Sequence, residues 1–205
     1  MLRALLLRAL RVLRVLPTLL AALTVASPAH AEAWDLPQLM AGLAQVQSHE
    51  SRFTEKKTIA LLKAPVESSG VLSYRRPDYV EKHILQPKDE SIIVNGDELT
   101  WKDGVSGKQR SLRLQNNAML AALVESIRAT LAGDLPALRR YFAVKLEGTQ
   151  THWTLSLMPA EDSMRRSVQA MRIEGYGNRV AVIDVLETGG DRSVMLIQHD
   201  AKNGG

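Results

Sequence analysis

The segment from Leu72 to Trp101 limits the possible folds most, because turn signals divide it into lengths that suit β-strands. Proline cannot donate a hydrogen bond to a sheet ladder, so Pro77 and Pro87 belong at strand ends or edges. Asn95-Gly96 accepts the positive φ of a tight hairpin turn. The pattern predicts a meander of antiparallel strands over Tyr79–Gln86, Ser91–Val94 and Leu99–Lys102.

Strand-length segments continue on both sides of this meander. Arg52–Leu62 and Val66–Arg75 precede it, and Gly104–Leu114 follows it. In the last third of the chain, turns that contain Gly or Asp separate five more candidates: Ala143–Glu147, His152–Met158, Val168–Glu174, Arg179–Leu186 and Ser193–His199. This regular spacing predicts a mainly β protein with helices, of the α+β class, built on one large antiparallel sheet or barrel.

Helical spacing interrupts the strands in two places. A first helix is expected to begin at Asp35, which can cap free backbone N–H groups, and to end at His49-Glu50. A second is expected over Asn116–Leu131, with Gly133 ending it and a shorter helix beginning at Asp134. The second helix is apolar over much of its circumference, which is more than one core face requires.

The first 31 residues have the pattern of a signal peptide. Four arginines precede an apolar run from Leu16 to Val25, and Ala29-His30-Ala31 supplies a cleavage site. A membrane anchor is the alternative, but the run is shorter than the ~20 apolar residues of a spanning helix. We therefore expect cleavage after Ala31 and a single domain over residues 32–205, located in the periplasm of a Gram-negative cell.

Removal of these 31 residues changes the charge balance. The 26 Lys and Arg of the whole chain lose four arginines, so 22 basic residues remain against 22 acidic ones. Nucleic-acid binding depends on excess positive charge, so we expect no nucleic-acid partner. The chain has no cysteine, and the remaining 174 of the 205 residues are enough for a core without disulfides.

The sequence offers little catalytic or metal-binding chemistry. The histidines after the signal, at positions 49, 83, 152 and 199, share no metal-ligand spacing, although His152 and His199 could meet across strands. Neither a G-x-S-x-G elbow nor a P-loop occurs. We expect no catalytic residue, metal or cofactor. What remains is an apolar helix against a large sheet, which predicts either a packed core or an interior lined by aliphatic side chains for a flexible chain.

The order of these elements resembles the LolA-type periplasmic carriers of outer-membrane lipoproteins. The resemblance is carried by Ser51–Lys56, Arg75–Pro77, Gln86–Asn95 and Gly96–Trp101, followed by the apolar helix and more strands. It implies a half-open antiparallel β-barrel, a strongly curved sheet with a helical lid over an apolar cavity for acyl chains. It also implies that the arginine of the R-P motif, Arg76, holds the lid shut by hydrogen bonds to lid carbonyls.

The resemblance also implies which residues line the cavity and its lid and which partners the protein has. The expected cavity and lid residues are Phe53, Val80, Ile92, Trp101, Met119, Leu123, Val124 and Ile127. The expected partners of this monomer are an acylated lipoprotein or other lipid cargo, an inner-membrane release complex and an outer-membrane acceptor. The chain departs from the family at Val80, where a bulkier residue is expected, and in ending soon after its last strand.

These departures predict a shorter, divergent member of the family, whose cargo could also be a glycolipid or a lipid-linked pigment precursor. The alternative function is a lipid- or lipoprotein-sensing regulatory module of the same fold, which signals through a protein partner. A third class, a hydrolase with a Ser–His–Asp site assembled from distant segments, has no motif in its support.

Overall fold

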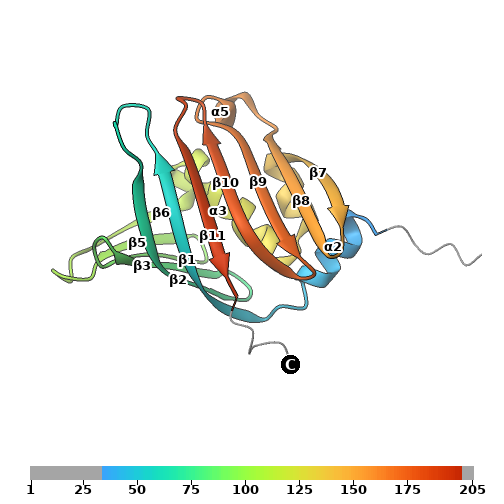
Figure 1. Ribbon diagram of the computed structural model, residues 1–205, viewed down its shortest axis with the longest axis horizontal. Helices are drawn as coiled ribbons and strands as arrows, with labels where there is room; N and C mark the ends of the chain where they lie inside the picture. Colours follow the sequence, from blue (N-terminus) through green and yellow to red (C-terminus); the bar gives the residue numbers. More distant parts are fainter. Residues whose placement is uncertain (1–33, 200–205) are drawn as a thin grey trace, which may run out of the picture. The chain divides into compact units, whose positions relative to one another are not determined.

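The computed structural model describes residues 34–199 (Figure 1). The predicted signal peptide and its cleavage after Ala31 lie outside the described residues. The helices are α2 (Leu36–Leu43), η1 (Leu114–Asn116, a 3-10 turn), α3 (Ala118–Ala132), α4 (Leu135–Tyr141) and α5 (Asp162–Arg165). The strands are β1 (Ser48–Thr58), β2 (Val66–Arg75), β3 (Tyr79–Gln86), β4 (Glu90–Asn95), β5 (Glu98–Asp103), β6 (Gln109–Arg113), β7 (Phe142–Thr149), β8 (His152–Pro159), β9 (Val168–Tyr176), β10 (Arg179–Glu187) and β11 (Arg192–Gln198).

The strands form one antiparallel sheet of 11 strands in the order β6-β5-β4-β3-β2-β1-β11-β10-β9-β8-β7. The predicted α+β class and the large, strongly curved sheet are confirmed. Two meanders, β1–β6 and β7–β11, meet where β1 pairs with β11, which joins segments far apart in the sequence. Figure 1 shows the strands in front and α3 behind them.

A bend between β2 and β3 separates the β3–β6 part of the sheet from the rest. The register shifts between Ser69 and Gly70, and a Cβ placed at Gly70 would lie 1.9 Å from the carbonyl oxygen of His83. Only glycine permits this close approach of two backbones. The bend allows the β3–β6 wall to turn toward α3.

The first helix is shorter than its sequence pattern indicates. Asp35 caps α2 as expected, because its side chain accepts from the Gln38 N–H and the Gln38 side chain accepts from the Asp35 N–H. The prediction that this helix continues to His49-Glu50 is wrong, since α2 ends at Leu43 and both residues lie in β1. β1 pairs with β2 on one side and β11 on the other, and these two ladders outweigh the local helical pattern.

The main core lies between the helices and the concave face of the sheet. Its largest fully buried side chains include Trp153, Phe53 and Phe142. Gly133 ends α3 with φ 68°, and a Cβ there would lie 2.1 Å from the carbonyl oxygen of Met40. The C-terminal ends of α2 and α3 therefore approach closely. None of the described helices is long and apolar enough to cross a membrane.

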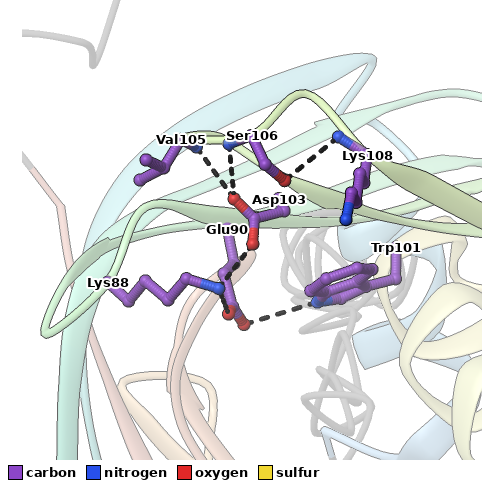
Figure 2. A network of polar contacts seen from close by, with 7 residues as sticks. All are labelled: Lys88, Glu90, Trp101, Asp103, Val105, Ser106 and Lys108. Atoms are coloured by element: carbon purple, nitrogen blue, oxygen red, sulfur yellow. Dashed lines mark hydrogen bonds and ion pairs between the residues drawn. The ribbon is translucent and has the colours of Figure 1, made fainter.

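A polar network joins the β3–β4 loop to the β5–β6 hairpin (Figure 2). Lys88 Nζ lies 2.6 Å from Asp103 Oδ2 and 2.9 Å from Glu90 Oε1. The other Asp103 oxygen accepts from the backbone N–H groups of Val105 and Ser106, at 3.0 and 2.8 Å. The hydrogen bond from Lys88, with help from these N–H groups, lowers the pKa of Asp103 to about 2. The network fixes the outer end of the β3–β6 wall.

The substitution Lys88→Met is expected to raise the pKa of Asp103 from about 2 toward the ordinary 3.8. Because the folded pKa lies below the ordinary one, the network stabilises the fold above about pH 4 and loses this contribution as the pH falls toward 2. Carboxyl chemical shifts followed by NMR between these values measure the change. The control Lys145→Met removes an exposed pair with Glu147 on β7 and should leave Asp103 unaffected. If the titration of Asp103 is unchanged in Lys88→Met, the hydrogen bond from Lys88 is not the cause of the lowered pKa.

Candidate functional site

Helix α3 is apolar on two sides because it has two packing partners. Small residues on one side, Ala122, Ser126, Ala129 and Thr130, are buried. The hydroxyl of Ser126 lies 2.7 Å from the carbonyl oxygen of Leu123 and 3.1 Å from Met171 Sδ on β9. The opposite side carries the larger Leu120, Leu123, Val124 and Ile127, which face a cavity. This double packing explains why the sequence of α3 is apolar over so much of its circumference.

The cavity lies between α3 and the concave face of the sheet and has a volume of about 240 Å³. Strands β1, β2, β3, β4, β5, β10 and β11 contribute its walls. The apolar lining residues are Leu72, Val80, Ile92, Val94, Leu99, Leu120, Leu123, Val124, Ile127, Ile183, Val185 and Met195. The polar ones are Glu55, Lys82 and Ser193. An interior of this composition favours aliphatic groups and offers them few polar contacts.

The polar residues of the cavity form one network around Glu55. Its carboxylate accepts from Lys82 Nζ at 2.5 Å, Ser193 Oγ at 2.7 Å and Ser68 Oγ at 3.1 Å. Burial disfavours the ionised form of Glu55, but the charge and hydrogen bond of Lys82, together with the two serines, outweigh it and lower the pKa of Glu55. The network therefore holds a paired carboxylate in place and leaves the rest of the cavity apolar.

The structure brings together most of the cavity residues expected from the sequence. Val80, Ile92, Leu123, Val124 and Ile127 line the cavity. Phe53 and Trp101 do not line it, and Met119 is not described in this respect. Phe53 is fully buried in the core, Trp101 donates its indole N–H to Glu90 at 3.3 Å, and the side chain of Met119 is outside the described set.

The lining residues that the sequence did not predict come from both meanders and from α3: Glu55, Leu72, Lys82, Val94, Leu99, Leu120, Ile183, Val185, Ser193 and Met195. Ile183, Val185, Ser193 and Met195 lie on β10 and β11 and reach the cavity only because β11 pairs with β1. The sequences of these two strands carry runs of adjacent apolar residues, such as Val194 to Ile197, so they do not show which residues point inward. Nor do they say which strand will be the neighbour of β1.

Two arginines bind backbone carbonyl groups next to the helices. Arg76 donates from Nη1 to the carbonyl oxygen of Ala44, the residue that caps the C-terminus of α2. Arg128, on α3 itself, donates from Nη1 to the carbonyl oxygen of Gly96 in the β4–β5 turn at 2.5 Å and pairs with Glu125 at 2.8 Å. Arg76 was expected from the sequence and Arg128 was not, although Arg128 fastens α3 directly to the β3–β6 wall.

The histidines are arranged differently from the sequence expectation. His152 lies 3.5 Å from Glu174 and stacks on Tyr176, whereas His199 contacts His49 at 2.7 Å, so His152 and His199 do not meet. Among residues 34–199, no group of three or more His, Cys, Asp or Glu side chains is placed to hold a metal ion.

Comparison with known proteins gives a family match over most of the chain. The family model described as "Outer membrane lipoprotein carrier protein LolA-like" matches residues 27–204. A search of curated proteins gives no match.

Similar solved structures include a LolA superfamily protein from Nitrosomonas europaea, with 10% identity and a TM-score of 0.41, covering 82% of this chain and 93% of that one. A domain named for outer membrane lipoprotein sorting from Vibrio parahaemolyticus has 6% identity, a TM-score of 0.45 and coverages of 83% and 92%. The MucA/MucB complex of Pseudomonas aeruginosa has 12% identity, a TM-score of 0.44 and coverages of 83% and 60%.

Proposed function

The chain belongs to the LolA-like family of outer membrane lipoprotein carrier proteins, and from this membership we propose that it is a non-enzymatic periplasmic carrier of acylated cargo. Acyl chains of a lipoprotein, or of a related lipid, occupy the cavity under α3 while the protein ferries them toward the outer membrane. An inner-membrane complex supplies the cargo and an outer-membrane acceptor receives it from the monomer. The apolar lining of the cavity is the observation that carries this proposal.

The energetics favour such a cavity. Burial of one methylene is worth about 0.8 kcal/mol, so exposure of one sixteen-carbon chain to water costs roughly 12 kcal/mol. A soluble carrier lowers this cost by providing an aliphatic surface. The apolar lining residues of the cavity supply that surface, and Glu55, the one carboxylate among the described lining residues, is paired with Lys82.

The size of the cavity implies that α3 moves when cargo enters. Its volume of about 240 Å³ lies below the ~300–1,000 Å³ of typical ligand pockets. We propose that this volume belongs to a closed form, in which α3 acts as the lid. Cargo can bind only after the closed form has opened, so the closing free energy is subtracted from the affinity of the open form for cargo. The lower net affinity allows release without ATP.

Lipid analysis tests this function. We expect mass spectrometry of the purified protein to identify co-purified acylated lipid, and delipidated protein to take up a fluorescent acyl probe. A transfer assay from inner-membrane vesicles to outer-membrane vesicles should then show movement of an acylated cargo. Protein that carries no lipid and takes up no acyl probe would exclude the proposal. Uptake of lipid without any transfer would instead indicate a sensing module.

The substitutions Arg128→Met and Arg76→Leu are expected to weaken closure and to make cargo harder to release. A hydrogen bond from a charged donor contributes about 1.5–3 kcal/mol, so Arg128→Met should raise acyl-probe affinity roughly tenfold or more. Arg76 binds the end of α2, which packs against α3, so a smaller increase is expected there. Probe titration and the vesicle transfer rate measure both.

The matched control for these variants is Arg110→Leu, which removes an exposed arginine from β6. Probe affinity and transfer rate should equal those of the unaltered protein in this control. If Arg128→Met leaves the acyl-probe affinity unchanged, Arg128 does not hold the lid closed. If Arg76→Leu leaves the vesicle transfer rate unchanged, Arg76 does not hold it closed either.

A further inference from the structure

A second pocket of about 370 Å³ lies beside the C-terminal end of α2. Leu72 lines both this pocket and the cavity under α3. Its apolar part is formed by Leu43, Val46, Leu72, Leu131, Val180 and Ile197. Its polar part is formed by Ser48, His49, Ser51, Tyr74, Asn178, Arg179 and His199. Unlike the cavity under α3, this pocket is amphipathic, and no carboxylate is among the described residues that line it.

Three polar atoms from β1 and from the residue after β11 converge in the pocket. His49 Nε2 lies 2.7 Å from His199 Nδ1 and 2.6 Å from Ser51 Oγ, and Ser51 Oγ lies 3.2 Å from His199 Nδ1. The pairing of β1 with β11 explains the convergence, because Arg52 is opposite Gln198 and the next pair outward is Ser51 and His199. The cluster is thus set by the sheet register.

The hydrogen positions in this cluster follow from its outer partner. The carbonyl oxygen of Val180 can only accept, so His199 Nε2, at 2.6 Å from it, carries a hydrogen. The Nδ1 of neutral His199 is then an acceptor, and His49 Nε2 donates to it. The partner of His199 Nε2 is a backbone carbonyl group and not a carboxylate, so the arrangement lacks the acid of a catalytic triad. The hydroxyl of Ser51 and the N–H of His49 are donors that can be turned toward a ligand.

A buried hydroxyl beside this cluster lacks a partner. Tyr74 is 3% exposed and lines the pocket, and its hydroxyl has no hydrogen-bond partner among residues 34–199. Tyr74 is directly opposite His49 in the β1–β2 ladder, so both side chains lie on the same face of the sheet. A buried hydroxyl without a partner is unfavourable, and a ligand that accepts a hydrogen bond from it would recover this loss.

We propose that this pocket binds a single-chain amphiphile with a carboxylate head, such as a free fatty acid. The head accepts hydrogen bonds from Tyr74, Ser51 and His49, and the chain lies along Leu43, Val46 and Leu131. Arg179 adds positive charge to the same pocket. A carboxylate fits because it accepts hydrogen bonds from these donors, whereas a cationic head would find no carboxylate among the described residues of the lining.

Proton uptake accompanies binding at this site. Burial, the neighbouring His199 and Arg179 lower the pKa of His49 in the empty pocket. The groups that face His49 are Ser51 on its own strand, Tyr74 on β2, Arg179 on β10 and His199 after β11, while α2 and α3 contribute apolar residues to the lining. A bound carboxylate offsets the positive charges, so it favours protonated His49. Affinity should therefore rise as the pH falls from about 7.5 to about 6.

Calorimetric titration of the purified, delipidated protein with decanoate tests the proposal. Decan-1-ol and decyltrimethylammonium are the controls, with the same chain and a neutral or cationic head. We expect decanoate to bind at least tenfold more tightly than either, and more tightly at pH 6 than at pH 7.5. Equal binding of the three compounds, or no binding of decanoate, would overturn the proposal.

Three variants test whether these residues bind a ligand or only stabilise the fold. Tyr74→Phe should weaken decanoate binding about tenfold without lowering stability, because the hydroxyl it removes has no partner in the folded protein. His49→Gln should flatten the pH dependence of binding. Val124→Trp, which fills the cavity under α3, should leave decanoate binding intact. Loss of decanoate binding in Val124→Trp, or unchanged binding in Tyr74→Phe, would overturn the assignment, whatever the outcome for carrier function.

Discussion

The substitution Val124→Trp is expected to lower acyl-probe binding to the cavity under α3 by more than about tenfold. Val124 lies on the lid helix and faces the cavity, whose volume is about 240 Å³. An indole in this space occupies the volume that the acyl chain needs. Several methylene groups of the chain then stay exposed to water, at a cost of about 0.8 kcal/mol each. Because the added ring fills a void lined by apolar side chains, the free energy of unfolding should change by less than about 1–3 kcal/mol.

The control for this variant is Val105→Trp in the β5–β6 hairpin. Val105 is 78% exposed, so the same substitution there adds an indole without entering the cavity. Titration of both variants with the same fluorescent acyl probe, beside a denaturation curve, gives the comparison. Equal probe affinity in Val124→Trp and Val105→Trp would show that the cavity under α3 does not hold the acyl chain.

The substitution Trp153→Ala is expected to destabilise the protein by about 3–5 kcal/mol. Trp153 is fully buried on β8, and its indole N–H donates to the carbonyl oxygen of Gly177 in the β9–β10 turn at 2.8 Å. Removal of the ring leaves a cavity in the core and an unpaired carbonyl group in the turn. Asn178 lies in this turn, Arg179 follows it, and both line the second pocket, so loosening of the turn should also disturb that pocket.

Urea denaturation of Trp153→Ala and Trp101→Ala measures this difference. Trp101 is half-buried at the edge of the β3–β6 wall, where its indole donates to Glu90 at 3.3 Å, so its removal should cost much less. A loss of stability in Trp101→Ala as large as in Trp153→Ala would contradict the placement of the main core around β8.

Much of the fold is predictable from local patterns. Asp35 and Gly133 cap their helices as expected, and the strand candidates Val66–Arg75 and Tyr79–Gln86 coincide with β2 and β3. The failure at His49 has a clear reason. The helical spacing of Leu39, Leu43 and Val46 before it is a local signal, whereas the ladders that place His49 in β1 come from residues that are distant in the sequence.

Among the residues that line the candidate site, only some of the first meander and of α3 are predictable from the sequence. Val80 and Ile92 belong to the first meander, and Leu123, Val124 and Ile127 to the helix, and both patterns are visible in the sequence. Arg128 was missed because one of two charges inside an apolar helix has an ordinary explanation as a solvated residue. Its carbonyl partner, Gly96, lies in a turn whose position next to α3 depends on the bend at Gly70.

The sequence by itself determined the strands, the turns, the caps and a helix that is apolar on two sides, because each of these depends on neighbours within a few residues. The tertiary structure decided which strands became neighbours. The pairing of β1 with β11 brings Met195 to the cavity under α3 and His199 to His49 and Ser51. A pattern of period two fixes which face of a strand is buried, but only the closed hydrogen-bond ladder fixes its partner and register.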